Sequence, residues 1–143
     1  MRLREYGSAL DLKHRDVWID LWADDAVLVW PGGRFQGRLD IMRAFDQHSR
    51  IPGGHRHFAL DTSVELRGLC ASADSTFIRV DFTKTGPVLR SIGTYHDELI
   101  RMPDGVWRFT ARTATLESRI PIEAADFAGS PRGAANRPGT QPA

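Results

Sequence analysis

Hydrophobic residues recur at helical spacing in the first part of the chain. Leu3, Tyr6 and Leu10 are three and four positions apart, and the apolar residues of 17–22 continue the pattern. Because residues three or four apart share one face of an α-helix, we expect two helical segments here, with Asp16 capping the second. Residues 39–48 repeat the pattern and predict a third helix, which ends before the proline and glycines that follow.

Five segments rich in valine, isoleucine, threonine and aromatic residues predict β-strands. The first covers residues 26–30 and runs into a Pro-Gly-Gly turn, and the others cover residues 57–66, 75–82, 88–101 and 106–116. A Pro-Asp-Gly turn separates the last two. Parallel neighbours would need helical crossovers, so helices followed by adjacent strands predict an α+β fold with an antiparallel sheet. A curved sheet wrapped round the helices leaves a cavity at its open end.

The last fifteen residues differ in composition from the rest. Residues 129–143 contain three prolines and three glycines but no valine, isoleucine, leucine, methionine or aromatic residue. Such a segment cannot form a hydrophobic core, so we expect a disordered tail. Residues 1–128 contain no internal repeat and no long linker, which predicts one domain.

Charge and cysteine content exclude several classes of protein. The net charge is +1, from 19 basic and 18 acidic residues without a basic run, so we expect no nucleic-acid partner. Cys70 is the only cysteine, and no Cys/His spacing indicates structural zinc, so we expect no disulfide and no metal. The sequence shows neither the apolar core of a secretory signal peptide nor an apolar run long enough to span a membrane. We therefore expect a soluble cytoplasmic protein with no membrane partner.

Several short motifs, in this order and spacing, resemble the SnoaL-like family of the nuclear transport factor 2 superfamily. The resemblance covers residues 3–118. It implies a cone-shaped, cystatin-like fold in which N-terminal helices pack on a strongly curved antiparallel sheet that encloses a pocket. The motifs that carry it are YGSALD at 6–11, LWADDAV at 21–27, Gly37, HRHF at 55–58, GTYHD at 93–97 and DGVWRF at 104–109 with Arg112.

The chain is most similar to the dehydratases of that superfamily, which act on scytalone or on bile acids. In them a tyrosine and an aspartate of the first helix face a histidine at the start of the first long strand, and Tyr6, Asp11 and His57 match these positions. The resemblance implies that His57 is a base oriented by Asp11, while Tyr6 stabilises an enolate. Elimination of water would then need no cofactor and no metal.

Further residues are candidates for binding the substrate, a small organic molecule. Asp81 falls near another polar residue of the dehydratase sheet, and His96 or Asp97 occupies the place of an asparagine. Strand alternation leaves open whether Tyr95 and Asp97 or His96 and Glu98 face the pocket. We expect pocket walls from some of the large aromatic residues Trp22, Trp30, Phe45 and Phe58.

Three functions are consistent with these residues. The first is a cofactor-independent lyase or isomerase of the dehydratase or polyketide-cyclase type. The second is a non-catalytic ligand-binding or assembly module, in which Asp11 pairs with Arg15 on the helix surface. The third is a limonene-type epoxide hydrolase built on Arg79, Asp81 and Asp97. In each case we expect a homodimer that pairs through apolar residues of the last two strands.

The composition of residues 129–143 predicts that the tail is dispensable. A chain truncated after Ala128 should keep the Tm of the full chain, because the removed residues include no large apolar side chain. Differential scanning calorimetry of the two proteins tests this. A drop of many degrees on truncation would show that the tail packs on the domain.

Overall fold

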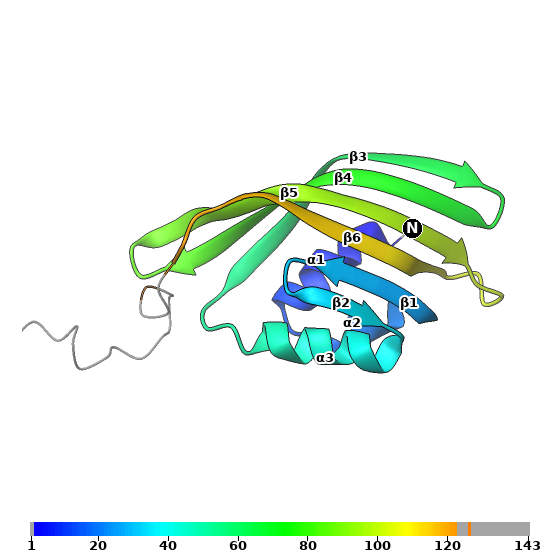
Figure 1. Cartoon of the computed structure of the whole chain (residues 1–143), viewed down its shortest axis with the longest axis horizontal. Helices are drawn as coiled ribbons and strands as arrows, with labels where there is room; N and C mark the ends of the chain where they lie inside the picture. Colours follow the sequence, from blue (N-terminus) through cyan, green and yellow to red (C-terminus); the bar gives the residue numbers. More distant parts are fainter. Residues whose placement is uncertain (1, 123–125, 127–143) are drawn as a thin grey trace, which may run out of the picture.

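The computed structural model describes residues 2–122 and 126, which form three helices and one sheet of six strands (Figure 1). Helix α2 begins after His14 and not at the expected cap Asp16, which lies within its first turn. The expected tail, residues 129–143, lies outside the described residues. The helices are α1 (Leu3–Asp11), α2 (Arg15–Asp20) and α3 (Arg38–Ser49).

The strands lie side by side in the order β2-β1-β6-β5-β4-β3. The prediction of an entirely antiparallel sheet is wrong in one place, because β1 pairs with β6 in parallel. Strand β2 turns back on one edge of β1, so the other edge of β1 is left to the last strand of the chain. The strands are β1 (Trp22–Trp30), β2 (Gly33–Gln36), β3 (His55–Arg67), β4 (Cys70–Thr83), β5 (Gly86–Arg101) and β6 (Trp107–Arg119).

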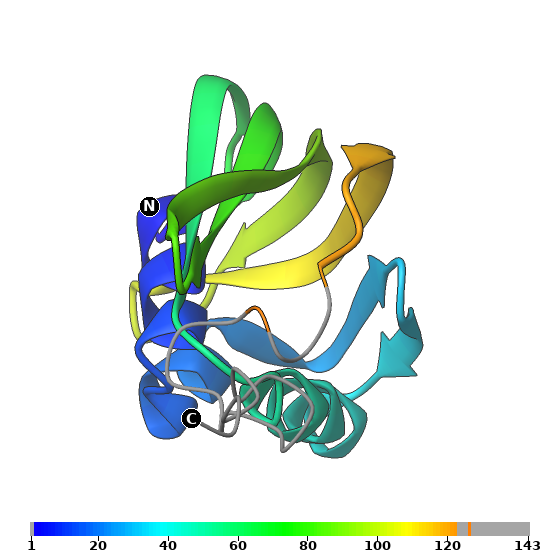
Figure 2. The ribbon, with the colours of Figure 1, turned by 90° about the vertical axis from the view of Figure 1, so that its left-hand side faces the viewer.

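The sheet curves over the helices, and both ribbon views place all three helices on the same side of it (Figure 2). This is the α+β cone that the resemblance implied. Helix α1 packs on β3 and on α2, whereas α3 packs on β1 and β2. The helices therefore close one part of the concave face and leave another part open.

An aromatic cluster fills the space between the helices and the sheet. The Trp18 and Trp22 ring centroids are 5.3 Å apart, and Trp22 lies 5.1 Å from Phe109. Phe45 of α3 packs 5.3 Å from Trp18 on the opposite side. All four side chains are buried. Rings of this size bury large apolar areas, and tilted pairs at these distances add favourable contacts.

An ion pair lies inside the same core. Asp97 of β5 faces Arg112 of β6, and the guanidinium donates two hydrogen bonds of 2.6 and 2.7 Å to the carboxylate. The guanidinium carbon also lies 4.1 Å from the ring centroid of Tyr6 and 3.9 Å from that of Tyr95. The cation is thus matched by one carboxylate and by ring faces, which attract cations.

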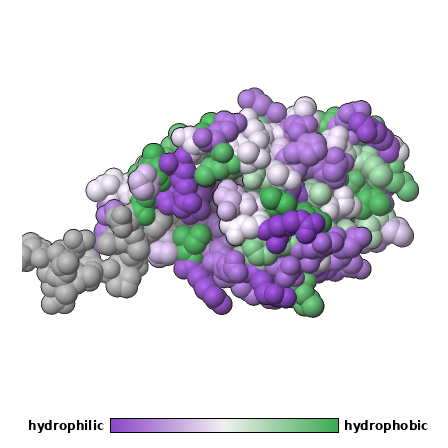
Figure 3. Space-filling view, in the orientation of Figure 1, coloured by the Kyte–Doolittle hydropathy of each residue, from purple (hydrophilic) through white to green (hydrophobic). Residues whose placement is uncertain are grey.

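The face of the molecule seen in Figure 3 is mostly hydrophilic, with apolar residues in separate patches. The exposed large apolar side chains concentrate on β3, with Phe58, Leu60, Val64 and Leu66, and are fewer on β5 and β6. The expected contact of a homodimer through the last two strands stays a prediction. None of the helices in the described part of the chain has the length and apolar character needed to span a bilayer.

The buried ion pair predicts an asymmetric response to mutation. Asp97→Ala should lower the free energy of unfolding by about 3–5 kcal/mol, because it leaves the Arg112 cation buried without its carboxylate. Urea denaturation measures the change. Asp46→Ala removes the partner of the exposed Arg15 and should cost far less. Equal effects of the two substitutions would contradict a dominant role for the buried pair.

Candidate active site

Asp11 and His57 meet where the end of α1 crosses the start of β3. The His57 Nδ1 lies 2.6 Å from Asp11 Oδ1, and the His57 backbone N–H donates to Asp11 Oδ2, also at 2.6 Å. The Asp11 side chain is 2% exposed and that of His57 is 10% exposed. The contact expected between these two residues is therefore present. The carboxylate accepts a hydrogen bond from Nδ1–H, which leaves the lone pair of the neutral ring on Nε2.

The close approach of α1 to β3 depends on a glycine. A Cβ on Gly7 would lie 3.1 Å from the backbone oxygen of His57. Gly7 precedes Asp11 by four residues, so it lies on nearly the same face of the helix one turn earlier. The absence of a side chain at Gly7 lets the helix come near enough for the carboxylate to reach His57.

The surface alternative for Asp11 does not occur in the structure. Arg15 turns toward α3 and donates to Asp46 at 2.9 and 3.2 Å. Lys13 adopts a positive φ of 58° in the turn after α1, and this turn separates Asp11 from the next helix. Because α1 and α2 are separate helices, the four-residue spacing of Asp11 and Arg15 does not place them on one helical face.

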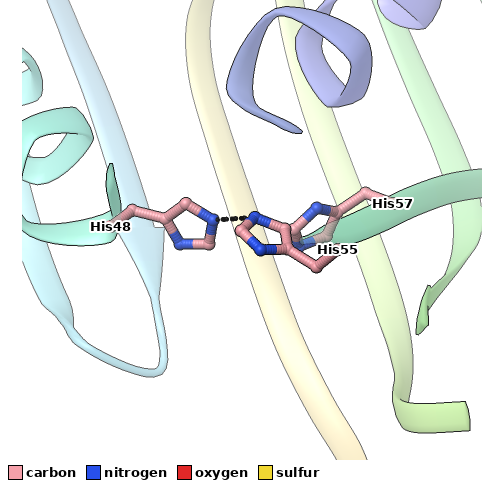
Figure 4. A group of neighbouring side chains, drawn as sticks. All are labelled: His48, His55 and His57. Atoms are coloured by element: carbon pink, nitrogen blue, oxygen red, sulfur yellow. Dashed lines mark hydrogen bonds between the residues drawn. The ribbon is translucent and has the colours of Figure 1, made fainter. Parts of the chain in front are cut away.

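Two further histidines lie beside the pair (Figure 4). His55 of β3 has its Nε2 3.6 Å from Asp11 Oδ1, and the His48 Nε2 of α3 lies 2.7 Å from the His55 Nε2. Burial and the neighbouring His57 lower the pKa of His48 to about 2, and burial lowers that of His55 to about 4. Both imidazoles are therefore neutral near pH 7.

The sequence pointed only to His57 of these three residues. A signal was present, because His55 and His57 are two positions apart on one strand and so lie on the same face. His48 carried no such signal, since its position beside them depends on how α3 packs.

A cavity of about 280 Å³ opens next to His48 and His57. Its polar lining includes Arg79, Ser91 and Arg119. Its apolar and aromatic lining suits a small flat organic molecule. These wall residues are Tyr6, Leu10, Trp30, Phe77, Tyr95 and Leu116. A second hollow, of about 410 Å³, lies along α1 and β3 and includes Asp11, His57 and Phe58.

Two tyrosines, Tyr6 and Tyr95, line the cavity. Burial raises the pKa of Tyr6, and burial raises that of Tyr95 to about 12. Both phenols therefore stay protonated at neutral pH and can donate a hydrogen bond to an oxygen of a bound molecule. Their rings pack 5.7 Å apart over the Arg112 guanidinium.

Alternation along β5 resolves which residues face inward. Tyr95 and Asp97 are buried, while His96 and Glu98 are exposed. His96 lies 2.7 Å from Asp74 on the outer face, so it is not in the pocket where we had expected it. Asp97 faces inward but is held by Arg112 in the core, and it does not line the cavity.

The remaining candidates are divided between cavity and core. Asp81 is buried and accepts from Arg79 at 2.6 Å, so Arg79 and not Asp81 borders the cavity. Trp30 lines the cavity as expected. Trp22 of β1 and Phe45 of α3 instead fill the aromatic core, where both rings pack against Trp18. Phe58 is 47% exposed and borders only the second hollow.

Comparison with known protein families gives a match for most of the chain. A family model of the SnoaL-like domain matches residues 3–113. No curated protein matches the chain.

Several solved structures share the fold. Rv3472, a function-unknown protein of Mycobacterium tuberculosis, is 25% identical, with 78% of this chain and 69% of that chain covered and a TM-score of 0.72. A protein of Novosphingobium aromaticivorans named "Putative Scytalone Dehydratase" is 18% identical, with 87% of each chain covered and a TM-score of 0.69. An NTF2-like protein with a cystatin-like fold from Novosphingobium aromaticivorans is 22% identical, with 78% and 75% covered and a TM-score of 0.72.

Strand β5 contains a position that tolerates only glycine, opposite the cavity-lining residue Phe77 of β4. A Cβ on Gly93 would lie 2.2 Å from the Thr115 backbone oxygen and 2.6 Å from Phe77 Cε1. Gly93→Ala should therefore destabilise the fold by about 3 kcal/mol, the upper part of the range for overpacking. It should also displace Phe77, which stacks on Tyr95 at 4.6 Å. Urea denaturation and near-UV circular dichroism measure the two effects, and Thr94→Ala on the outer face serves as the control. An unchanged stability would show that β5 and β6 can separate at little cost.

Proposed function

Because this chain belongs to the SnoaL-like domain family, we propose that it is a cofactor-independent lyase or isomerase acting on a small cyclic or polyketide-like molecule. The observation that carries the proposal is the buried Asp11 carboxylate held 2.6 Å from His57 Nδ1 at the edge of an aromatic cavity. A base with a fixed tautomer beside an apolar cavity suits proton abstraction from carbon.

The proposed reaction uses His57 as the group that moves the proton. Its Nε2 lone pair takes a proton from the carbon next to a substrate carbonyl, and the electrons pass to the carbonyl oxygen. A tyrosine hydroxyl, from Tyr6 or Tyr95, donates a hydrogen bond to that oxygen as its negative charge develops. Asp11 stabilises the imidazolium that forms.

The second half of the reaction returns the proton. In a dehydratase, the enolate electrons expel a hydroxyl on the adjacent carbon, and the imidazolium protonates it so that water leaves. In an isomerase, the proton returns to another carbon of the same conjugated system. Both outcomes leave His57 neutral and need no net redox change.

The epoxide-hydrolase alternative receives less support from the placement of its residues. That reaction needs a carboxylate that can activate water next to the substrate. Asp81 and Asp97 are both paired with arginines, and neither lines the cavity. The ligand-binding module remains the second candidate, since the aromatic wall would serve binding equally well.

Exchange of carbon-bound hydrogen tests the base directly. With 2-tetralone in D₂O and EDTA, the protein should accelerate deuterium uptake next to the carbonyl, followed by NMR. His57→Asn should lower this rate by about 10²- to 10⁴-fold, the usual contribution of a general base. Asp11→Asn should cost less, because it removes only the charge and orientation.

The control for these variants is His96→Asn, which changes an exposed histidine on the outer face. It should exchange the ketone at the wild-type rate. Exchange that persists in His57→Asn would remove His57 as the base. Ketone binding by the wild-type protein without any exchange would favour the non-catalytic module.

A further inference from the structure

Three imidazoles from two elements converge beside the cavity. His48 comes from the last turn of α3, and His55 and His57 come from the same face of β3. One ligand nitrogen of each ring lies within 4.8 Å of the other two. Figure 4 shows the rings of His48 and His55 pointing toward each other, with the His57 ring on the far side of His55 from His48. Histidine nitrogens gathered in this way are a common donor set for divalent transition metals.

Asp11 supplies the support that a metal-binding histidine requires. A ligating imidazole usually donates its other N–H to a carboxylate or carbonyl, which fixes the ring and the tautomer. Asp11 Oδ1 accepts from His57 Nδ1, so Nε2 is the nitrogen left for a cation. The same carboxylate oxygen lies 3.6 Å from His55 Nε2 and adds negative charge beside the group.

The contact between His48 and His55 also fits a site that binds a cation. Their Nε2 atoms face each other at 2.7 Å. One ring therefore donates its Nε2 proton to the lone pair on the Nε2 of the other ring. Two nitrogens on one tetrahedral metal, each about 2.0–2.1 Å from it, lie about 3.4 Å apart. Replacing the shared proton by a cation therefore requires the rings to separate by about 0.7 Å, given the usual Zn–N length.

The surroundings leave room for a further ligand. His48 and His57 both line the cavity, while His55 is buried and does not line it. Three protein nitrogens with one side open to a cavity are typical of metal sites that keep a position for water or another molecule. The sequence led us to expect no metal, because the three histidines come together only through the packing of α3 on the sheet.

We propose that His48, His55 and His57 form a binding site for a borderline divalent cation such as Zn²⁺, with Asp11 as the outer carboxylate that orients His57. This inference goes beyond the proposed acid–base function, and it makes a specific connection with it. A cation on His57 Nε2 occupies the lone pair that proton abstraction needs. The metal-bound and base forms of His57 are therefore mutually exclusive.

Cobalt serves as the spectroscopic probe of the site. The full chain, prepared without a histidine tag and stripped with EDTA, should bind one equivalent of Co²⁺ and develop visible d–d absorption typical of four- or five-coordinate cobalt. Isothermal titration with Zn²⁺ should give the same stoichiometry. His48→Gln should weaken Zn²⁺ binding by more than 100-fold, and Asp11→Asn should weaken it by about 10- to 100-fold, the usual effect of losing an outer carboxylate.

The matched control is His96→Gln, because His96 is exposed and lies outside the group. It should bind both metals as the wild-type protein does. His55→Gln, which changes a buried ring, is used only if circular dichroism shows that it folds. Equal Zn²⁺ affinity in wild-type and His48→Gln protein, or the absence of cobalt bands, would overturn the proposal.

The outcome is separable from that of the proposed function. The ketone exchange is measured with EDTA present, so it reports on the base whether or not a metal site exists. Zn²⁺ added in excess over the EDTA should suppress that exchange in the wild-type protein and have much less effect on any residual exchange of His48→Gln. Cobalt bands without ketone exchange would leave the metal site intact and remove only the acid–base function.

Discussion

The Asp11 carboxylate joins the first helix to the sheet, and the site depends on this connection. One oxygen accepts from the backbone N–H of His57 and the other from its ring, so a single side chain fixes both the strand and the imidazole. A buried carboxylate that kept fewer partners would be costly in free energy. The two hydrogen bonds offset this cost, and Gly7 removes the side chain that would keep α1 away from β3.

The chemistry of His57 depends on which group reaches its second nitrogen. In the proposed reaction, the lone pair acts as a base toward a carbon acid; in the proposed metal site, it acts as a ligand. Asp11 supports both roles in the same way, because it holds the Nδ1 proton in each. In the proposed metal site, His48 of α3 and His55 of β3 would supply the other two nitrogens beside His57.

Local patterns predicted the helices and most strands, whereas the contacts between distant segments required the fold. The spacing of Leu3, Tyr6 and Leu10 predicted α1. Strand β2 was not predicted, because Gly32 and Gly33 indicated only a turn at this place. Asp11 and His57 were paired only through the family resemblance, because 46 positions separate them. His48 was missed because the sequence pattern of α3 predicts which residues share a helical face but not which other element packs against that face.

The buried Arg112–Asp97 pair is better explained by positioning than by stability. Apolar residues of similar volume often replace such a pair with no loss of stability. Here the guanidinium lies against the rings of Tyr6 and Tyr95, and these rings also form part of the cavity wall. An apolar side chain would fill the space but would not hold the ring faces by charge. The ion pair thus connects the core to two tyrosines of the cavity wall.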